Sequence, residues 1–319
     1  MSFNQTDAYP GSGFEDSEND LKRLLLVIWR GKVLITAFTS VAAMVAVFVA
    51  LSLPNIYHSN ALLAPKDEAD SGGLQGLAKQ YGGLANFAGL SLPTGGSSVT
   101  KALLAKEKIR SLHFYTEYLY DYTLEGIMAV DFWDSSSGKI VYDSNIFDDS
   151  KGAWVREPAY PQKAKPSAQE AHREFLKLLS MTEDKETGLI ILSVKHQSPF
   201  FAKDLVMMII DAINHDLRTN DIKEAEDSIK FLEIQRELTS LVSLDEVFSQ
   251  LIEEQTKTIM LANVSQDYVF DIIDPPVVSE MKSEPRRANI CILATILGGM
   301  IGIMVVLIRH YGFKIAIER

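Results

Sequence analysis

The stretch DPPVVSEMKSEPRRANICILATILGGMIGIMVVLIRHYG, residues 274–312, decides how this chain folds. It places three prolines and two arginines before an uncharged run of 21 residues, 288–308. About 20 apolar residues in a helix cross a hydrocarbon core of roughly 30 Å. A core helix of a water-soluble domain would show a polar face, whereas after Asn289 only Cys291 and Thr295 are even mildly polar. We therefore expect a transmembrane helix over 288–308.

A second uncharged run of 21 residues covers 33–53. A buried core helix is one alternative, and a secretory signal peptide that ends near Ala50-Leu51-Ser52 is another. The run follows a polar leader of 32 residues and exceeds the usual apolar length of about 7 to 15 residues in signal peptides. We expect a retained transmembrane helix over 33–53.

Two spans place both chain ends on one side of the membrane and residues 54–287 on the other. Positive charge near the spans favours the cytoplasm. Seven basic residues lie on the terminal side and four flank the spans on the opposite side. We therefore expect cytoplasmic tails over 1–32 and 309–319 and an exported domain over 54–287. The terminal set is Lys22, Arg23, Arg30, Lys32, Arg309, Lys314 and Arg319, and the opposite set is Lys66, Lys282, Arg286 and Arg287.

Charge argues against a nucleic-acid-binding protein, and cysteine content excludes an intramolecular disulfide. The chain has a formal net charge of -11, and residues 54–287, with 36 acidic and 24 basic side chains, carry -12. Such a domain repels phosphate-rich polymers, so we expect no nucleic-acid partner. The one cysteine, Cys291, lies within the second run, so no intramolecular disulfide can form. The fold must depend on packing and assembly.

The first part of the chain predicts a disordered tail over 1–20 and an amphipathic approach to the membrane over 21–32, with Trp29 at the interface. Residues 55–65 alternate as a strand. Residues 71–98 are rich in glycine and leucine, which fits either a closely packed insert or a flexible loop. A helix is expected over 99–120.

The middle of the chain predicts a hairpin, a helix and a strand. Residues 126–134 and 139–143 flank the turn sequence SSSG, and residues 144–166 read as irregular. Ser167 and Glu170 form a capping box, which opens a helix whose apolar face we expect to contain Phe175, Leu176 and Leu179. The branched aliphatic side chains of 188–197 predict a strand.

A long helical hairpin follows. Ser198 and Pro199 are the cap and first residue of a helix over about 199–238, which has no internal glycine or proline and an apolar stripe at helical spacing. Such a helix would reach roughly 58 Å, longer than a domain of this size can cover. Ser243 and Glu246 form a second capping box, so a return helix is expected over about 244–263. The stripe comprises Leu205, Met208, Ile209, Ala212, Ile213 and Leu217, continued by Ile222, Ala225, Ile229 and Leu232.

A last strand is expected over 268–274, followed by a proline-rich membrane junction. Pro275, Pro276 and Pro285 restrict the backbone between this strand and the second span. The predicted fold class is therefore an α+β membrane protein, with two transmembrane helices flanking an α/β domain that carries an extended helical hairpin.

Motifs for catalysis are missing from the sequence. It contains no phosphate-binding glycine loop, HExxH, GxSxG or CxxC, and its six histidines are dispersed. We expect no catalytic residue, no cofactor and no metal site. The acidic cluster Asp131, Asp134, Asp143, Asp148 and Asp149 lacks calcium-loop spacing, and aspartate is also favoured in turns.

Two weaker patterns stay open. Small residues recur every fourth position in both spans, which predicts close helix packing in lipid, although small residues are common in spans by chance. Aromatic residues near 113–133 and 142–160 could stack on sugars or form part of a core. The small-residue set is Ala42, Ala46 and Ala50 with Ala294, Gly298 and Gly302.

In this order, several segments resemble the Wzz-type polysaccharide co-polymerases, the chain length determinant family of bacterial inner membranes. They are ENDLKRLLLVIWRGKVLI, LPNIYHSNALLAP, GGLANFAGLSL, ILSVKHQSPFFAKDLVMMIIDAIN, EEQTKTIMLANV and DPPVVSEMKSEPRRA. The proline segment is sparser than the family's fuller pattern.

The resemblance implies a protein of the inner membrane with a periplasmic domain over 54–287, assembled as a ring of several protomers, that governs glycan length without catalysis. Expected partners are further copies of the chain, a membrane-embedded polysaccharide polymerase and a lipid-linked glycan. O antigen is the first-ranked glycan, and the alternatives are enterobacterial common antigen, capsule or exopolysaccharide. Only eleven residues follow Ile308, too few for the kinase domain of a related branch.

Two functions from other classes stay open: a membrane-anchored periplasmic sensor and a tethered hydrolase or transferase. A sensor of this topology needs a cytoplasmic output module after the second span. The sequence does not determine the modal glycan length, the number of protomers or the mechanism of length control.

Overall fold

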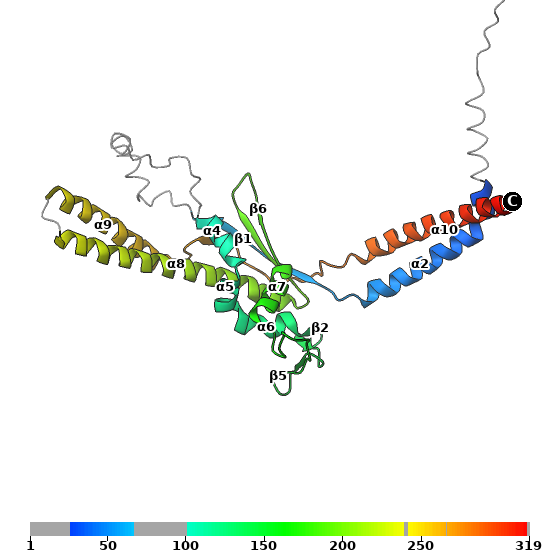
Figure 1. The fold of residues 1–319 in the computed structure, drawn as a ribbon, viewed down its shortest axis with the longest axis horizontal. Coiled ribbons are helices and arrows are strands. Elements are labelled where there is room, and N and C mark those ends of the chain that lie inside the picture. Colours follow the sequence, from blue (N-terminus) through cyan, green and yellow to red (C-terminus); the bar gives the residue numbers. More distant parts are fainter. Residues whose placement is uncertain (1–25, 67–100, 239–241, 266, 318–319) are drawn as a thin grey trace, which may run out of the picture. The chain divides into compact units, whose positions relative to one another are not determined.

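The computed structural model describes residues 26–66, 101–238, 242–265 and 267–317 (Figure 1). Two compact units divide the chain: the first contains the residues up to Asn55 and from Ser283, and the second contains Ile56–Lys282. The expectations for 1–20 and 71–98 fall outside the described residues.

The first unit is a pair of apolar helices. Helix α2 covers Lys32–Ser52 and helix α10 covers Arg287–Ile317, and the two pack side by side (Figure 1). Both are long and apolar enough to cross a membrane. Most of their large apolar side chains are exposed, with Met44 at 74% and Phe48 at 77%. Helix α10 continues past Ile308, the expected end of the span.

The second unit is built on an antiparallel sheet with the strand order β6-β7-β1-β8. Ala61 pairs with Leu192 and Leu63 pairs with Ile190, which fixes the register of the two central strands. Their buried side chains alternate along the chain, as expected for a sheet with one face in the core. The strands are β1 Tyr57–Pro65, β6 Leu179–Glu183, β7 Ile190–His196 and β8 Phe270–Asp274.

A broken helical segment replaces the single helix expected over 99–120. A break follows α4, and Ser111 caps the next turn by accepting a hydrogen bond from the Phe114 backbone N–H at 3.2 Å. Residues 126–128, expected as strand, are helical, and Gly126 lets Phe201 approach so closely that a Cβ would lie 2.3 Å from its ring. The elements are α4 Lys101–Ile109, α5 Leu112–Phe114, a π-helical turn η2 Tyr115–Leu119 and α6 Tyr120–Met128.

Two short hairpins follow α6. Strands β2 Val130–Asp134 and β3 Lys139–Tyr142 form the hairpin expected around SSSG. Its turn uses Gly138 at φ 66°, a conformation that favours glycine. Strands β4 Phe147–Asp148 and β5 Ala153–Trp154 form a second hairpin inside 144–166, which the sequence had indicated as irregular.

Helix α7, Ala168–Leu178, begins with the predicted capping box of Ser167 and Glu170. Its apolar face was predicted only in part. Phe175 is buried, but Leu176 is 40% exposed and Leu179 is the first residue of β6. The helix ends at Leu178, one residue before Leu179, and Leu176 is rotated about 100° from Phe175, away from the core.

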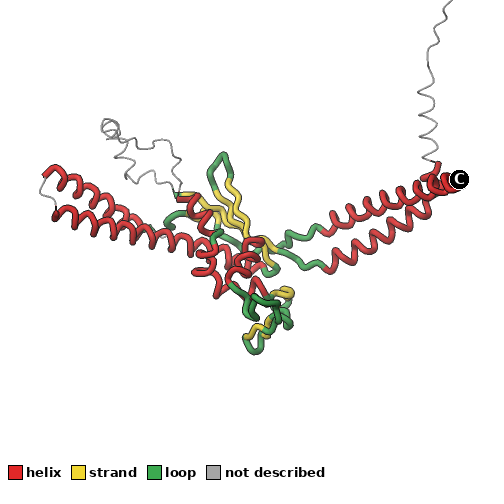
Figure 2. The backbone as a smooth tube through the Cα atoms, viewed as in Figure 1, coloured by secondary structure: helices red, strands yellow, loops and turns green. Residues whose placement is uncertain are grey.

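The helical hairpin consists of α8, Pro199–Leu238, and α9, Val242–Val264, which pack against each other (Figure 2). Ser198 caps α8 by accepting from the Phe201 backbone N–H at 3.3 Å. Helix α9 begins at Val242, within two residues of the predicted start. The N-terminal half of α8 covers the inner face of β1 and β7 and completes the core with Leu205, Ile209, Ile213 and Leu217.

Candidate functional site

The α8–α9 hairpin is the candidate site, because both of its helices expose apolar surface that the rest of the unit does not cover. In α8, Ala225 is the one buried residue after Leu217. Among the described side chains of α9, Ala262 is the buried one. We define the hairpin surface as the exposed large apolar side chains of α8 beyond Ala225 and of α9 along its length: Phe231, Ile234, Leu238, Leu244, Val247, Met260, Leu261 and Val264.

The hairpin surface exposes more apolar area than a surface that contacts only water usually does. Phe231 is 60% exposed, Leu238 76% and Val264 83%. Groups of exposed apolar side chains on one element mark interaction sites more often than single ones do. Between the helices lies a cleft of about 680 Å³, lined partly by charged residues of α8 such as Lys223 and Asp227. The arrangement can bind protein surfaces.

A buried polar cluster fixes α8 to the body of the unit. Asp216 is only 6% exposed and forms an ion pair with Lys108 of α4. It also accepts hydrogen bonds from the Tyr118 hydroxyl and the Asn220 amide, both at 3.0 Å. Burial and the neighbouring Asp216 carboxylate raise the pKa of Tyr118 to about 12, so the phenol remains a donor.

A second polar cluster joins α8 to α4 and to the start of β8. Asp221 forms an ion pair with Lys101 at 2.9 Å and accepts from the Tyr268 hydroxyl at 2.6 Å. Burial opposes the charge of Lys101, but Asp221 outweighs it and raises its pKa. Asn214 Oδ1 accepts from the Val269 backbone N–H at 2.9 Å. Together the clusters hold the base of the hairpin rigidly, a feature that apolar periodicity in the sequence does not indicate.

The small-residue stripes of the apolar helices face each other within the first unit. A Cβ on Gly298 would lie 2.4 Å from the Cβ of Ala42, and one on Gly302 would lie 3.1 Å from the Ile35 Cα. Ala46 and Ala50 are buried, while Ala294 is half-buried. The stripes are therefore occupied by contact between α2 and α10 of one chain.

The proline-rich junction is divided between the two units, and each part has contacts in its own unit. In the second unit, Pro276 is buried and the Ser59 hydroxyl donates to the neighbouring Val277 carbonyl at 2.9 Å, whereas Pro275 is exposed. In the first unit, Pro285 is half-buried and lies two residues before Arg287.

Arg287 ties the two helices of the first unit together at this end. It donates to the Leu53 carbonyl at 3.3 Å and to the Asn55 Oδ1 at 3.2 Å. The end of α2 is therefore joined to the start of α10.

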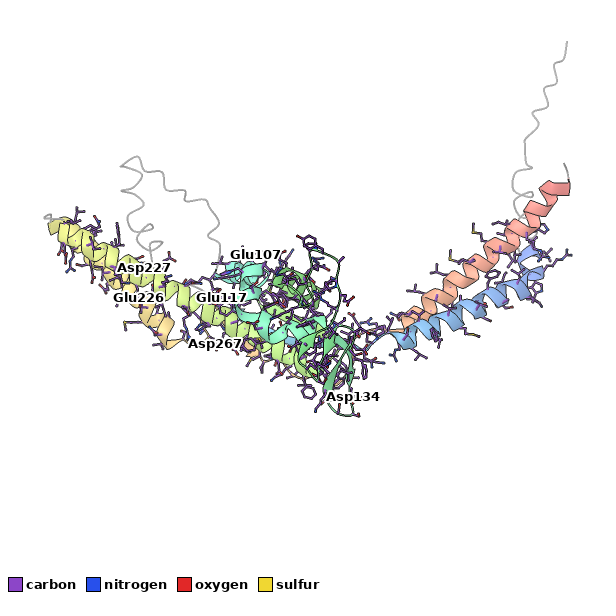
Figure 3. The ribbon with its side chains drawn as sticks, turned by 60° about the horizontal axis from the view of Figure 1, so that its bottom comes forward. Glu107, Glu117, Asp134, Glu226, Asp227 and Asp267 are labelled. Carbon is purple, nitrogen blue, oxygen red and sulfur yellow. The ribbon has the colours of Figure 1, made fainter. Side chains whose placement is uncertain are left out.

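Three of the aspartates considered as a calcium site, Asp134, Asp143 and Asp148, bind their own turns. Asp134 accepts from the backbone N–H and hydroxyl of Ser136 at 2.9 and 2.7 Å and from the Ser137 hydroxyl at 2.7 Å, and these bonds lower its pKa to about 2. Asp148 accepts from Ser150 in the same way. Figure 3 shows Asp134 far along the unit from Glu226 and Asp227 of α8. Among the described residues no three metal-ligating side chains gather.

Most aromatic residues that could have formed a sugar-stacking surface pack on each other instead. Trp133 contacts Tyr57 with ring centroids 5.4 Å apart, and Phe147 contacts Trp154 at 5.1 Å. Tyr122, at 77%, and Tyr160, at 97%, remain exposed. The core explanation therefore holds for the majority of this set.

Two family models each match part of the chain. The model of Wzz, chain length determinant protein, matches residues 17–120, and the model of GNVR, a G-rich domain on tyrosine kinases, matches residues 231–311. Between them the two matches cover more than half of the chain. No match was found among curated proteins.

Two of the solved structures that the comparison matched are co-polymerases. One is a full-length bacterial polysaccharide co-polymerase, 15% identical, with 91% of this chain and 97% of that chain covered and a TM-score of 0.39. Another is a fragment of WzzB, a polysaccharide co-polymerase from Salmonella Typhimurium, 12% identical, with 72% and 100% covered and a TM-score of 0.26. The chain therefore carries a Wzz chain length determinant domain together with a GNVR domain.

Proposed function

We propose that this chain regulates the length of a bacterial surface polysaccharide, with O antigen as the glycan. It acts without catalysis, as an oligomeric scaffold beside a membrane-embedded polymerase. The Wzz domain supports a role in chain length determination. The hairpin surface carries the proposal of a scaffold, because its apolar side chains need a partner and further copies of the chain present the same surface.

The physical case for assembly rests on the hairpin. Helix α8 has 40 residues, about 60 Å at 1.5 Å per residue, and its outer part gains little from the core. Two helices with few mutually buried side chains are marginal in water. Packing of neighbouring hairpins would bury side chains such as Leu238 and Val264, each contributing roughly 1.5–3 kcal/mol if fully covered.

We further propose that α2 and α10 span the inner membrane with both chain ends in the cytoplasm and the second unit in the periplasm. Their exposed apolar side chains suit contact with lipid. The fit of Gly298 against Ala42 supports a retained α2, because a cleaved signal peptide would leave α10 without this partner. Seven basic residues on the terminal side support the orientation.

Deletion of the gene in its own bacterium tests the function. We expect the modal length of the glycan to be lost on a gel and to be restored by the wild-type gene. A plasmid with Phe231→Glu and Val264→Glu should fail to restore it, whereas Lys230→Glu, an exposed polar change on the same helix, should succeed. An unchanged length distribution after deletion would end the proposal.

The same strain distinguishes the alternatives. A change confined to enterobacterial common antigen, capsule or exopolysaccharide would retain the mechanism and reassign the glycan. A periplasmic sensor would instead alter the amount of glycan, with its length distribution intact.

A further inference from the structure

A cleft of the second unit, away from the hairpin surface, has the features of a ligand site. It has a volume of about 870 Å³ and lies between the first turn of α7 and the segment 159–167. We call it the α7 cleft. Its walls carry two tyrosines, Tyr120 and Tyr160, and three basic side chains, Lys163, Lys165 and Arg173.

The wall of the α7 cleft is fixed before any ligand arrives. Arg156 donates to the Ala164 carbonyl at 2.8 Å, to the Lys163 carbonyl at 2.9 Å and to the Glu170 carboxylate at 2.7 Å. The Tyr120 hydroxyl donates to the Pro166 carbonyl at 2.6 Å. Because these bonds hold the backbone, a ligand would not have to order the loop, which favours binding.

The Tyr160 side chain lies outside the core. It is 97% exposed, so its ring contributes almost nothing to the core. An aromatic ring held open at the mouth of a cleft offers an apolar face to a flat partner, such as the C–H face of a sugar ring.

The three bases give the α7 cleft a charge opposite to that of its domain. Lys163, Lys165 and Arg173 are exposed, and none has a carboxylate partner within the part of the chain that the structure describes. The Lys165 ammonium lies 5.4 Å from the centre of the Tyr120 ring. The one lining carboxylate, Glu170, is already paired with Arg156. In a region of net charge -12, these bases form a local site for an anion.

We propose that the α7 cleft binds an acidic sugar unit, one that carries a carboxylate or a phosphate. The sugar ring lies on Tyr160, and Lys163, Lys165 and Arg173 hold the charge. The proposal rests on the proposed function only in taking the glycan as the natural ligand. A neutral sugar would leave the three bases unused.

Calorimetric titration of the full chain in detergent tests this site. The probes are hexagalacturonate, mannose 6-phosphate and, as a neutral oligosaccharide of the same length as the first, maltohexaose. We expect an acidic probe to bind, with an affinity that falls as salt is added. The Lys163→Gln/Lys165→Gln variant should weaken binding roughly five- to ten-fold, and Tyr160→Ala roughly three- to ten-fold. All three side chains are exposed, so both variants should fold.

Two control variants test whether the loss of binding is specific to the α7 cleft. Lys185→Gln removes an exposed lysine, and Tyr122→Ala an exposed tyrosine, outside the α7 cleft, and both should bind like wild type. Equal binding of maltohexaose, or acidic binding that the cleft variants do not weaken, overturns the site. The acidic probe that binds more tightly identifies the charge as carboxylate or phosphate.

The outcomes separate this site from the proposed function. If deletion of the gene shifts glycan length while the cleft variants bind like wild type, only the α7 cleft is refuted. If deletion leaves glycan length unchanged, the proposed function fails whether or not the α7 cleft binds acidic sugars.

Discussion

His196 illustrates how a single buried residue links two elements of the second unit. Its Nε2 donates to the Gly126 carbonyl at 2.7 Å, and its Nδ1 accepts from the Ser198 backbone N–H at 3.0 Å. The ring packs on Phe201 with centroids 4.3 Å apart. Only the neutral ring can accept at Nδ1, so this contact between the end of β7 and the start of α8 requires an uncharged histidine.

We predict that His196 makes stability depend on pH. Burial lowers its pKa in the folded chain below the ordinary 6.5, so the unfolded chain takes up the proton first as the pH falls. The contribution of His196 to the free energy of unfolding should therefore be fully present above about pH 6.5. It should be lost as the pH falls from there through the folded pKa. Thermal melts of wild type and His196→Gln between pH 7.5 and 5 measure this. The variant should lose the slope, while His113→Gln, at a residue whose side chain is 80% exposed, should keep it.

Asp216 is the residue whose loss should destabilise the base of the hairpin most. We predict that Asp216→Asn lowers the free energy of unfolding by about 3 kcal/mol, because Lys108 would lose its partner in a mostly buried site. Denaturant titration followed by circular dichroism measures the change. The control is Asp227→Asn on the same helix, which breaks an exposed pair with Lys230 and should cost less than about 0.5 kcal/mol. Equal costs for the two variants would contradict the role given to Asp216.

At the scale of elements, the contact between α2 and α10 depends on where each Cβ lies. We predict that Gly298→Ala destabilises the pair by about 1–3 kcal/mol, because the added Cβ would lie 2.4 Å from that of Ala42. Ala42→Gly combined with Gly298→Ala moves the methyl group to the other helix and should restore most of the loss. Thermal unfolding in detergent compares wild type, Gly298→Ala and the double variant. If Gly298→Ala is as stable as wild type, the helices do not pack this closely.

The elements themselves were predictable where one local signal dominates. The capping box of Ser167 and Glu170 placed the start of α7 because both partners are three residues apart in the chain. The break between α4 and α5 was missed, since Ser111 caps a turn inside a stretch that is otherwise helical by periodicity. The continuation of α6 to Met128 depends on Gly126 against Phe201, 75 residues away, which no local pattern reports.

For the whole molecule, we predict a stable oligomer that the hairpin surface holds together. The full chain in detergent should have a protein mass several times 35.5 kDa. Phe231→Glu with Val264→Glu should reduce the mass, because each charge would be buried between copies without a partner. Lys230→Glu is the control, and mass photometry or light scattering provides the measurement. A wild-type chain of single mass would refute assembly.

The orientation of the whole chain gives a separate prediction. In a Cys291→Ser background, a cysteine at Lys185 should react with a membrane-impermeant maleimide in intact spheroplasts. A cysteine at Asn4 should react only after lysis, because positive charge near the spans favours a cytoplasmic location for the chain ends. The reverse labelling pattern would show that the chain ends lie in the periplasm and the second unit in the cytoplasm.

The sequence by itself determined the features that depend on composition and on neighbours within a few turns. These include the two apolar helices, the alternation of β1, the extent of α8 from Pro199 and the absence of motifs for catalysis. Such features follow from hydrophobic periodicity and capping, which act over about ten residues.

Only the tertiary structure decided which residues meet. It brought Lys108 of α4 to Asp216 of α8, set Gly298 against Ala42, and gathered Lys163 and Arg173 in one cleft with Tyr160. These partners are far apart in the chain or belong to different elements. Their contact follows from how sheet and helices pack, and packing sums many weak, non-directional contributions that no short stretch of sequence contains.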